Sequence, residues 1–297
     1  MTQANLPPEL IDNIIGFIAI PRKLDNLYLD ISFRSSDEKR VKPDLYSCSL
    51  VCREWRELAR PHIFHTVGLR CVLPLEEGPI TLEAFLAFLD ATPQVPLCIR
   101  KLDLTLIRTT TKRWYLHEEQ PVSGVDHVVL HTVLNRLSRL HSLSLTGEHL
   151  FTSTLDDWAP TPIDIRHVHC NSTLGDVFPL LQLLGNVNEL VVKSHHSFVN
   201  ISYLARPAVA LSHLKLRSLR LAAYSPIASF VEGILLSPVV NTLDSLSLMN
   251  FNTGDNCTAL KRLLGRVGPR LLDIWIDASC ILAPLEPPGQ LSGSVAF

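Results

Sequence analysis

The chain has 297 residues, of which 46% are hydrophobic and 19% charged, and its mean hydropathy is +0.20. This composition is ample for a packed core and argues against global disorder. The 27 basic and 29 acidic residues leave a formal net charge of -2, which argues against a phosphate-neutralising surface, so we expect no nucleic-acid partner.

The first expected element is an amphipathic helix near the N-terminus. Pro7 and Pro8 precede apolar residues at helical spacing, from Leu10 to Ile18, and proline suits the first turn of a helix. The segment carries acids where a secretory signal would be basic, and its apolar run is far shorter than the ~20 residues that span a bilayer. We therefore expect neither a signal peptide nor a membrane partner.

A charged stretch follows this helix. We interpret residues 22–42 as an insertion or flexible loop, in which an alternation of apolar residues is compatible with a short strand. Helical spacing returns at Asp44, and we expect one helix from there to Pro61, because proline usually ends a helix.

Beyond residue 65 the sequence repeats a pattern of apolar-x-x-apolar-x-apolar. The central residues of its occurrences are Val67, Leu102, Leu143, Val168, Leu190, Leu219, Leu246 and Ile274. Amphipathic stretches lie between most of them, and the later occurrences are 22 to 29 residues apart, as in leucine-rich repeats. Residues 106–124 are expected to form a polar loop. One strand and one helix per unit predict an α/β solenoid with a curved parallel sheet and outer helices.

Several helix ends can be placed from capping residues. Ser123 and Asp126 form a capping-box pair before one helix. Another is expected over residues 177–184, ending at Gly185, and a third is expected to end at Gly265. The expected organisation is thus a helical module at 5–65, an irregular solenoid at 66–280 and a tail at 281–297.

The N-terminal segment resembles an F-box, on a Leu-Pro start, an apolar first helix and a Val-Cys-x-x-Trp signature. Followed by a leucine-rich region, it is similar to the F-box proteins abundant in mushroom-forming (basidiomycete) fungi. Two features depart from the family pattern: the insertion at 22–42 is longer than usual, and no regular Asn follows the strands. In the family, the matching positions form the F-box core and its adaptor-facing surface; they are Leu6, Pro7, Leu10, Ile14, Leu45, Val51, Cys52 and Trp55.

The resemblance implies a function in protein degradation. Residues 5–65 would bind a Skp-type adaptor and through it a cullin, and the solenoid would bind a protein target. The protein would be a non-enzymatic substrate receptor of an SCF-type ubiquitin ligase, cytoplasmic or nuclear. The alternative is a leucine-rich interaction scaffold without a degradation role.

Catalytic and metal sites are not indicated by any motif. The seven cysteines are scattered, which is typical of free thiols in a reducing compartment. The set Cys48, Cys52, His62 and His65 has the wrong spacing for the usual zinc finger. No Gly-x-Ser-x-Gly, His-Glu-x-x-His or Walker pattern occurs. We expect no metal, cofactor or enzymatic activity; a thiol hydrolase would require a Cys and a His together in a pocket.

The target site is expected on the concave face of the sheet. In a Leu-x-Leu strand the apolar residues enter the core and their neighbours face outward. These neighbours form the rows Lys101, Asp103, Thr105; Ser142, Ser144, Thr146; Glu189, Val191, Lys193; Ser218, Arg220, Ala222; Ser245, Ser247, Met249; and Asp273, Trp275, Asp277. Trp and Arg are enriched at binding hot spots and Met adapts to irregular partners. We expect Arg220, Met249 and Trp275 to bind the target, with Trp275 as a main anchor. The alternatives are that the loops bind instead or that Trp275 packs under the tail.

The end of the chain lacks a helical pattern. Residues 281–297 are rich in Pro and Gly and follow the last expected strand. A solenoid needs a cap on its last repeat, so we expect a loosely ordered tail and a poorly covered final strand, as in a truncated solenoid.

Overall fold

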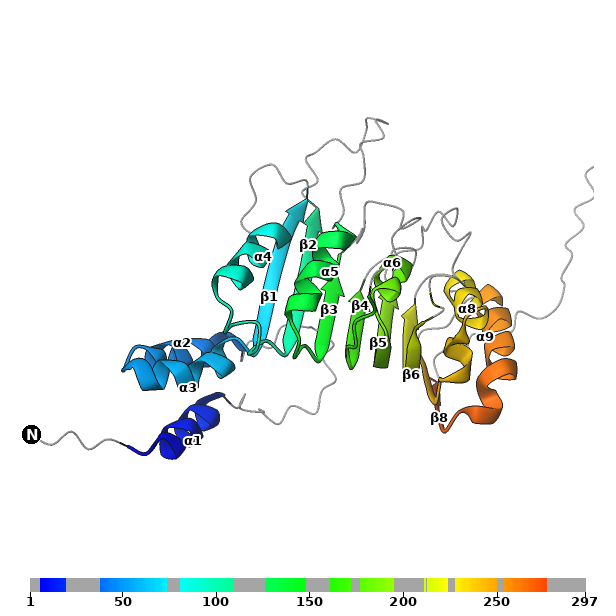
Figure 1. The fold of residues 1–297 in the computed structure, drawn as a ribbon. Coiled ribbons are helices and arrows are strands. Elements are labelled where there is room, and N and C mark those ends of the chain that lie inside the picture. Colours follow the sequence, from blue (N-terminus) through cyan, green and yellow to red (C-terminus); the bar gives the residue numbers. More distant parts are fainter. Residues whose placement is uncertain are drawn as a thin grey trace, which may run out of the picture.

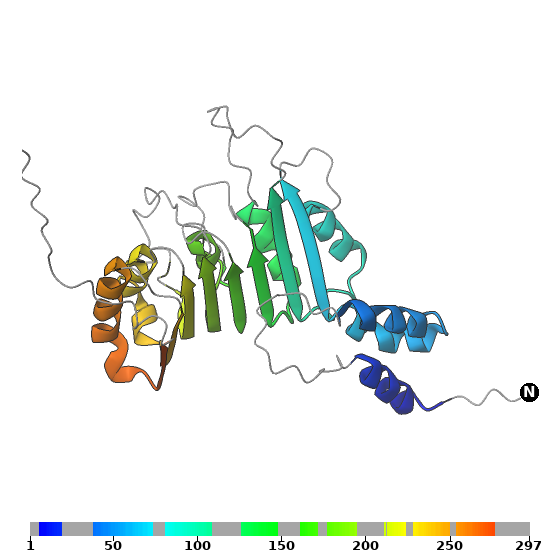
Figure 2. The same cartoon turned by 180° about the vertical axis from the view of Figure 1, so that it is seen from behind.

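The computed structural model describes residues 6–19, 38–73, 81–108, 126–147, 161–171, 177–194, 211, 213–223, 228–249 and 254–276. In these residues the chain forms a group of helices at its N-terminal end, followed by one long sheet with helices along it (Figure 1). The helices near the N-terminus lie beyond β1, at one end of the sheet (Figures 1 and 2).

Within the described residues, the N-terminal module consists of three helices: α1 (Pro8–Ala19), α2 (Glu38–Ser49) and α3 (Arg53–Ile63). Their apolar residues at helical spacing meet in a small core of their own. Its buried members are Ile11, Ile15, Leu45, Cys48, Ala59 and Ile63. Residues at i and i+4 lie on one side of a helix, so Ile11 and Ile15 turn the same side of α1 toward α2 and α3.

The second helical segment differs from the prediction. In place of one helix from Asp44 to Pro61, α2 and α3 are separated by a turn, because Cys52 has an extended backbone with φ -160° and ψ 177°. Pro61 lies inside the last turn of α3, where the amide of Phe64 still donates to the Arg60 carbonyl at 3.0 Å. Apolar spacing continues through the turn and cannot reveal the break. The end of the charged stretch, 38–42, is helical rather than looped; residues 20–37 lie outside the described part.

The strands form a single sheet whose order follows the sequence. They are β1 (Thr66–Leu73), β2 (Lys101–Arg108), β3 (Ser142–Thr146), β4 (His167–Asn171), β5 (Asn186–Ser194), β6 (Lys215–Ala223), β7 (Ser245–Met249) and β8 (Asp273–Ile276). Every neighbouring pair in this eight-stranded sheet is parallel. The α/β class with a parallel sheet and outer helices is therefore confirmed.

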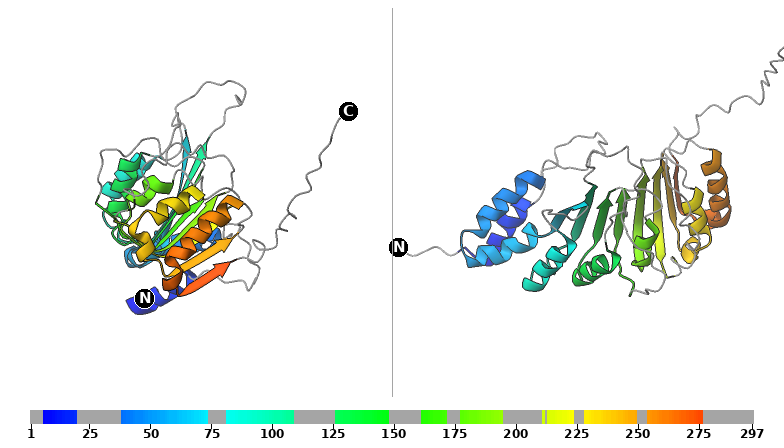
Figure 3. Two further views of the ribbon diagram at one scale, coloured as in Figure 1. Left: turned by 90° about the vertical axis from the view of Figure 1, so that its right-hand side faces the viewer. Right: turned by 90° about the horizontal axis from the view of Figure 1, so that it is seen from above.

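The helices after the module cover one face of the sheet, as Figure 3 (right) shows. They are α4 (Leu82–Ala91), α5 (His127–Arg136), α6 (Val177–Gln182), α8 (Ala228–Leu235) and α9 (Gly254–Val267), with short 3-10 helices η3 (Pro238–Asn241) and η4 (Gly268–Arg270). Seen from behind in Figure 2, the other face carries none of the described helices. We call this second face the open face.

The core lies between the sheet and its helices. Alternate strand residues enter it, and Leu102, Leu143, Val168, Leu190, Leu219 and Leu246 are all 0% exposed. Because only one face is covered, the period of two along each strand fixes which side chains are buried. The helix ends differ in detail from those expected: Asp126 itself caps α5, its carboxylate accepting from the Val128 amide at 2.7 Å. Ser123 is not described, α6 ends at Gln182, and α9 continues through Gly265 to Val267.

The final strand is the least covered. Its core-side residues Ile274 and Ile276 are 47% and 37% exposed, whereas the matching residues of β7 are 0% exposed. The described residues thus agree with a poorly covered last strand, while the expected tail at 281–297 lies outside them.

Candidate binding surfaces

The N-terminal module exposes a second apolar side of α1. Leu10 is 50% exposed, Ile14 41% and Phe17 75%, whereas the adjacent Ile11 and Ile15 are at most 2% exposed. The apolar face of α1 is therefore wider than the side that packs in the core of the module. Leu6, just before α1, is also exposed at 46%.

The turn between α2 and α3 is apolar and exposed as well. Leu50 is 78% exposed and Val51 62%, and Tyr46 on the last turns of α2 is 50% exposed. Figures 1 and 2 place the start of α1 and this turn at the same end of the molecule, away from the sheet. Soluble proteins rarely gather this many large exposed apolar side chains on so small a module unless a partner covers them.

The residues expected to contact an adaptor divide into two groups. Leu45 is buried and Trp55 packs half-buried against the same core, so these two build the module rather than its surface. The others lie at the surface: Leu6, Pro7, Leu10, Ile14, Val51 and Cys52. The Pro7 carbonyl accepts from the amide of Leu10 at 3.0 Å, which begins α1.

Sequence reasoning missed the most exposed apolar residues of this surface. Phe17 and Leu50 were not singled out, although Phe17 follows Ile14 by three positions and so shares its side of α1. Leu50 lies in the turn that precedes the extended residue Cys52, and the helical spacing of the apolar residues concealed this turn.

The open face carries polar side chains in rows that run across the strands. The register aligns Asp103, Ser144, His169, Val191, Arg220, Ser247 and Trp275 in one row. Sequence reasoning omitted β4 from this face, and with it His167, His169 and Asn171. The apolar pattern around Val168 was the signal that could have placed them, because its neighbours must face outward.

The middle of the open face holds a charged cluster. The Glu189 carboxylate pairs with Arg220 Nε at 2.7 Å and with His167 Nδ1 at 3.2 Å. The pKa of His169 is lowered, because the effect of burial exceeds the opposing effect of the nearby Glu189 carboxylate. Burial also lowers the pKa of Lys193. Val191, expected to face outward, is only 7% exposed, since it lies between His169 and Arg220 in the register.

The three expected target-binding residues lie on adjacent strands of this face. Trp275 on β8 is 47% exposed, so the described residues do not bury it. The register places Arg220, Ser247 and Trp275 side by side on β6, β7 and β8, and Met249 is half-buried one row away. Asp277 is not described.

The cysteines do not form an activated thiol site in the described residues. Burial raises the pKa of Cys170 to about 12 and also raises the pKa of Cys48 and Cys71. Cys98 shares a hollow of about 340 Å³ with His62 and His65, but its thiol donates to the Gln94 carbonyl at 3.4 Å and burial raises its pKa. An activated nucleophile has a lowered pKa.

Neither a metal-binding cluster nor a membrane-spanning helix is found in the described residues. They contain no group of three or more His, Cys, Asp or Glu side chains placed to hold a metal ion. Among the described helices there is none of the length and apolar character that crossing a membrane requires.

Comparison with known proteins does not assign the chain to a family. No family model matches it, and a search of curated proteins returns no match.

Proposed function

We propose that the protein is a substrate receptor of an SCF-type ubiquitin ligase. Residues 5–65 act as an F-box that binds a Skp-type adaptor, which connects it to a cullin, and the solenoid of residues 66–280 binds a protein target. The observation that carries the proposal is the exposed apolar surface of the N-terminal module, with Leu10, Phe17 and Leu50 at 50%, 75% and 78% exposure.

The small size of the N-terminal module supports the proposal. A module of three short helices has little core, and modules of this size are marginally stable alone. Its spare apolar side chains gain free energy when a partner removes them from water. Adaptor binding therefore accounts for the exposed surface and also supports the module's fold.

Co-purification with a Skp-type adaptor tests the proposal. The double variant Ile14→Asp, Val51→Asp places two carboxylates on the exposed apolar surface without touching the buried core, and unpaired charges oppose an apolar interface. We expect it to lose the adaptor and the cullin. Leu236→Asp is the matched control, because Leu236 is 65% exposed but lies after α8 in the solenoid.

The outcome separates the two functions considered. Loss of adaptor in the double variant, with an unchanged circular dichroism spectrum and retention in the control, supports the proposal. If the wild-type chain captures neither adaptor nor cullin while still binding a target, the protein is an interaction scaffold without a degradation role.

The target is assigned to the open face, at β6, β7 and β8. Trp275 is the main anchor, because it is large, exposed and level with Arg220 in the register. Trp275→Ala should weaken target capture by more than ~1 kcal/mol and leave the adaptor bound. Equal capture by the variant and the wild type would show that another surface, such as the loops, binds the target.

A further inference from the structure

The last strand of the described sheet, β8, has one unpaired side. The strand order places β7 on one side of β8 and no described strand on the other. Figures 1 and 3 show this end of the sheet, with α9 near it, at the opposite end of the molecule from the N-terminal module. An unpaired strand edge presents main-chain donors and acceptors that another extended chain can use.

The register identifies the main-chain groups that face this free edge. The amide of Asp273 donates to the Asp244 carbonyl, on the β7 side, at 3.3 Å. Along an extended strand, the main-chain groups of successive residues point to opposite sides. The groups of Asp273 and Trp275 therefore point to β7, whereas the N–H and C=O groups of Ile274 and Ile276 point to the free edge.

The side chains of these two isoleucines are incompletely covered. They lie on the side of the sheet that carries the helices, yet Ile274 is 47% exposed and Ile276 37%. Leu272, just before the strand, is 86% exposed, and Leu264 of α9 is only half-buried although it packs against the core. An added strand with apolar residues on this side would remove the isoleucine side chains from water.

The open-face side of β8 is acidic beside Trp275. Asp273 is exposed, as is Asp244 just before β7, and neither belongs to the ion pairs found among the described residues. Arg270, a short distance before β8, donates from Nη1 to Asn241 Oδ1 at 3.2 Å. A basic side chain can pair with a carboxylate and can also stack on an indole ring. This side of β8 therefore favours a cationic partner.

We propose that β8 binds an extended peptide segment of a target protein as an additional strand of the sheet. The segment alternates apolar residues, which pack beside Ile274 and Ile276, with lysine or arginine residues, which face Asp273 and Trp275. In strand addition, main-chain hydrogen bonds supply affinity and the alternate side chains supply specificity. The inference rests on the proposed target site at β8 and names how the target is held there; it does not depend on adaptor binding.

Charge and composition distinguish this partner from two other occupants of the edge. A second copy of the chain, paired antiparallel about Trp275, would set Asp273 opposite Asp277 of the other copy, and like charges directly opposite are destabilising. Residues 281–297 contain three prolines, which lack the amide donor, and no lysine or arginine. Neither occupant therefore matches the edge as well as a basic, alternating segment does.

Fluorescence anisotropy with the full chain tests the charge preference. The probe is a fluorescein-labelled peptide of alternating sequence, Lys-Val-Arg-Ile-Lys-Val-Arg, and its counterpart carries glutamate in place of every basic residue. We expect the basic peptide to bind at least about tenfold more tightly than the acidic one, because the edge is acidic.

Two N-methylated forms of the basic peptide test the main-chain hydrogen bonds. Methyl groups on the valine and isoleucine amides remove the donors of one edge of the peptide, and methyl groups on the lysine and arginine amides remove those of the other. Only one edge of an added strand faces β8. We therefore expect one form to lose at least about tenfold in affinity and the other to lose less than about threefold.

Two variants of the chain test the assignment to β8. Ile274→Pro removes the amide that faces the edge but leaves the hydrogen bonds to β7, and edge strands tolerate proline at such positions; it should lose at least about tenfold in affinity for the basic peptide. Asp273→Lys should abolish the preference for the basic peptide. Glu83→Lys is the matched control, because it changes the net charge equally at an exposed position of α4, near the other end of the sheet.

Several results would overturn the proposal. It is wrong if the basic and acidic peptides bind alike, if both N-methylated forms bind equally, or if Asp273→Lys keeps the preference while remaining folded. Displacement of the probe by a synthetic peptide of residues 281–297 would assign the edge to the chain's own tail. A dimer, seen by light scattering, that Ile274→Pro dissociates would assign the edge to a second copy.

Failure of strand addition is distinguishable from failure of the proposed function. If none of the peptides binds while Trp275→Ala still weakens target capture, strand addition is overturned and the proposed target site on the open face stands. If the wild-type chain binds the basic peptide but captures no adaptor, the degradation role is overturned and the assignment of the edge stands.

Discussion

The orientation of α1 can be tested with two neighbouring isoleucines of the N-terminal module. Ile15 is 0% exposed and belongs to the module's core, whereas Ile14 is 41% exposed. Replacing a fully buried isoleucine with alanine costs about 2–5 kcal/mol in transfer free energy and cavity formation. The same change at Ile14 removes partly solvated atoms and gains helix propensity, so we expect less than about 0.5 kcal/mol.

Hydrogen exchange followed by mass spectrometry measures the difference locally. A loss of about 3 kcal/mol in Ile15→Ala should accelerate amide exchange in α1 and α3 by more than about 100-fold. Ile14→Ala should leave these rates within a few-fold of the wild type. Equal acceleration in both variants, or a larger effect at Ile14, would mean that α1 packs with a different side and that the exposed apolar surface is misassigned.

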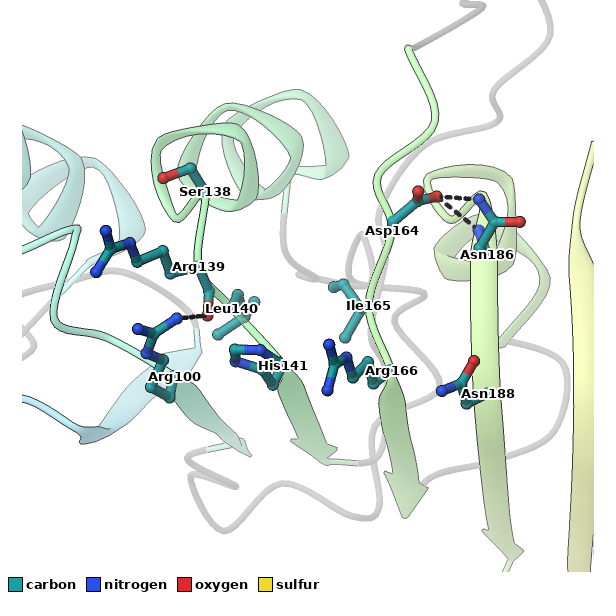
Figure 4. Close-up of a pocket in the computed structure, with 10 residues that line it drawn as sticks. All are labelled: Arg100, Ser138, Arg139, Leu140, His141, Asp164, Ile165, Arg166, Asn186 and Asn188. Atoms are coloured by element: carbon teal, nitrogen blue, oxygen red, sulfur yellow. Dashed lines mark hydrogen bonds between the residues drawn. The ribbon is translucent and has the colours of Figure 1, made fainter.

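Two further predictions concern the thiols and an arginine-lined hollow where β3, β4 and β5 begin, whose lining includes Arg100, Arg139, His141 and Arg166 (Figure 4). Burial is the main cause that lowers the pKa of His141, and the nearby Arg166, Arg100 and His167 lower it further. Arg166→Gln should therefore raise this pKa part of the way toward its ordinary value, which an NMR titration of the imidazole checks. Arg217→Gln should leave the pKa of His141 unchanged, because Arg217, which holds the position on β6 equivalent to Arg166 on β4, is not among the groups that lower it. Alkylation of the native protein at pH 8, read by peptide mass spectrometry, should label the exposed Cys52 and spare the buried Cys170, whose pKa is raised to about 12. Labelling of Cys170 at the rate of Cys52 would contradict the buried position of β4.

The strands were predictable because a one-sided sheet imposes a strict alternation. Each central residue of the repeated apolar pattern lies in a strand, from Val67 in β1 to Ile274 in β8. Burial of one face makes a slip of one residue costly, so the pattern persists even where the spacing of the repeats varies. The same alternation places the outward residues without knowledge of the loops.

Helix ends and breaks were less predictable because they depend on single residues. The turn between α2 and α3 rests on the extended backbone of Cys52, which no spacing rule reveals. Pro61 was expected to end the helix, but α3 tolerates the loss of the one hydrogen bond that its missing amide would have donated, and Ile63 remains helical. The arginine-lined hollow was missed for another reason: its residues are far apart in sequence and meet only through the register.

The charged cluster at the centre of the open face lowers the contribution to target binding that we expect from Arg220. Glu189 is shared by His167 and Arg220, so a target carboxylate that binds Arg220 competes with an existing partner. Exposed ion pairs contribute little free energy, typically ~0–1 kcal/mol. Replacing Glu189 with a target carboxylate as the partner of Arg220 would therefore add even less binding free energy. The indole of Trp275 is uncharged and therefore has no ion pair to exchange, and its 47% exposed ring would lose solvent contact on docking. If the target docks on this face as proposed, the free energy of binding should therefore come mainly from Trp275, with Arg220 contributing selectivity.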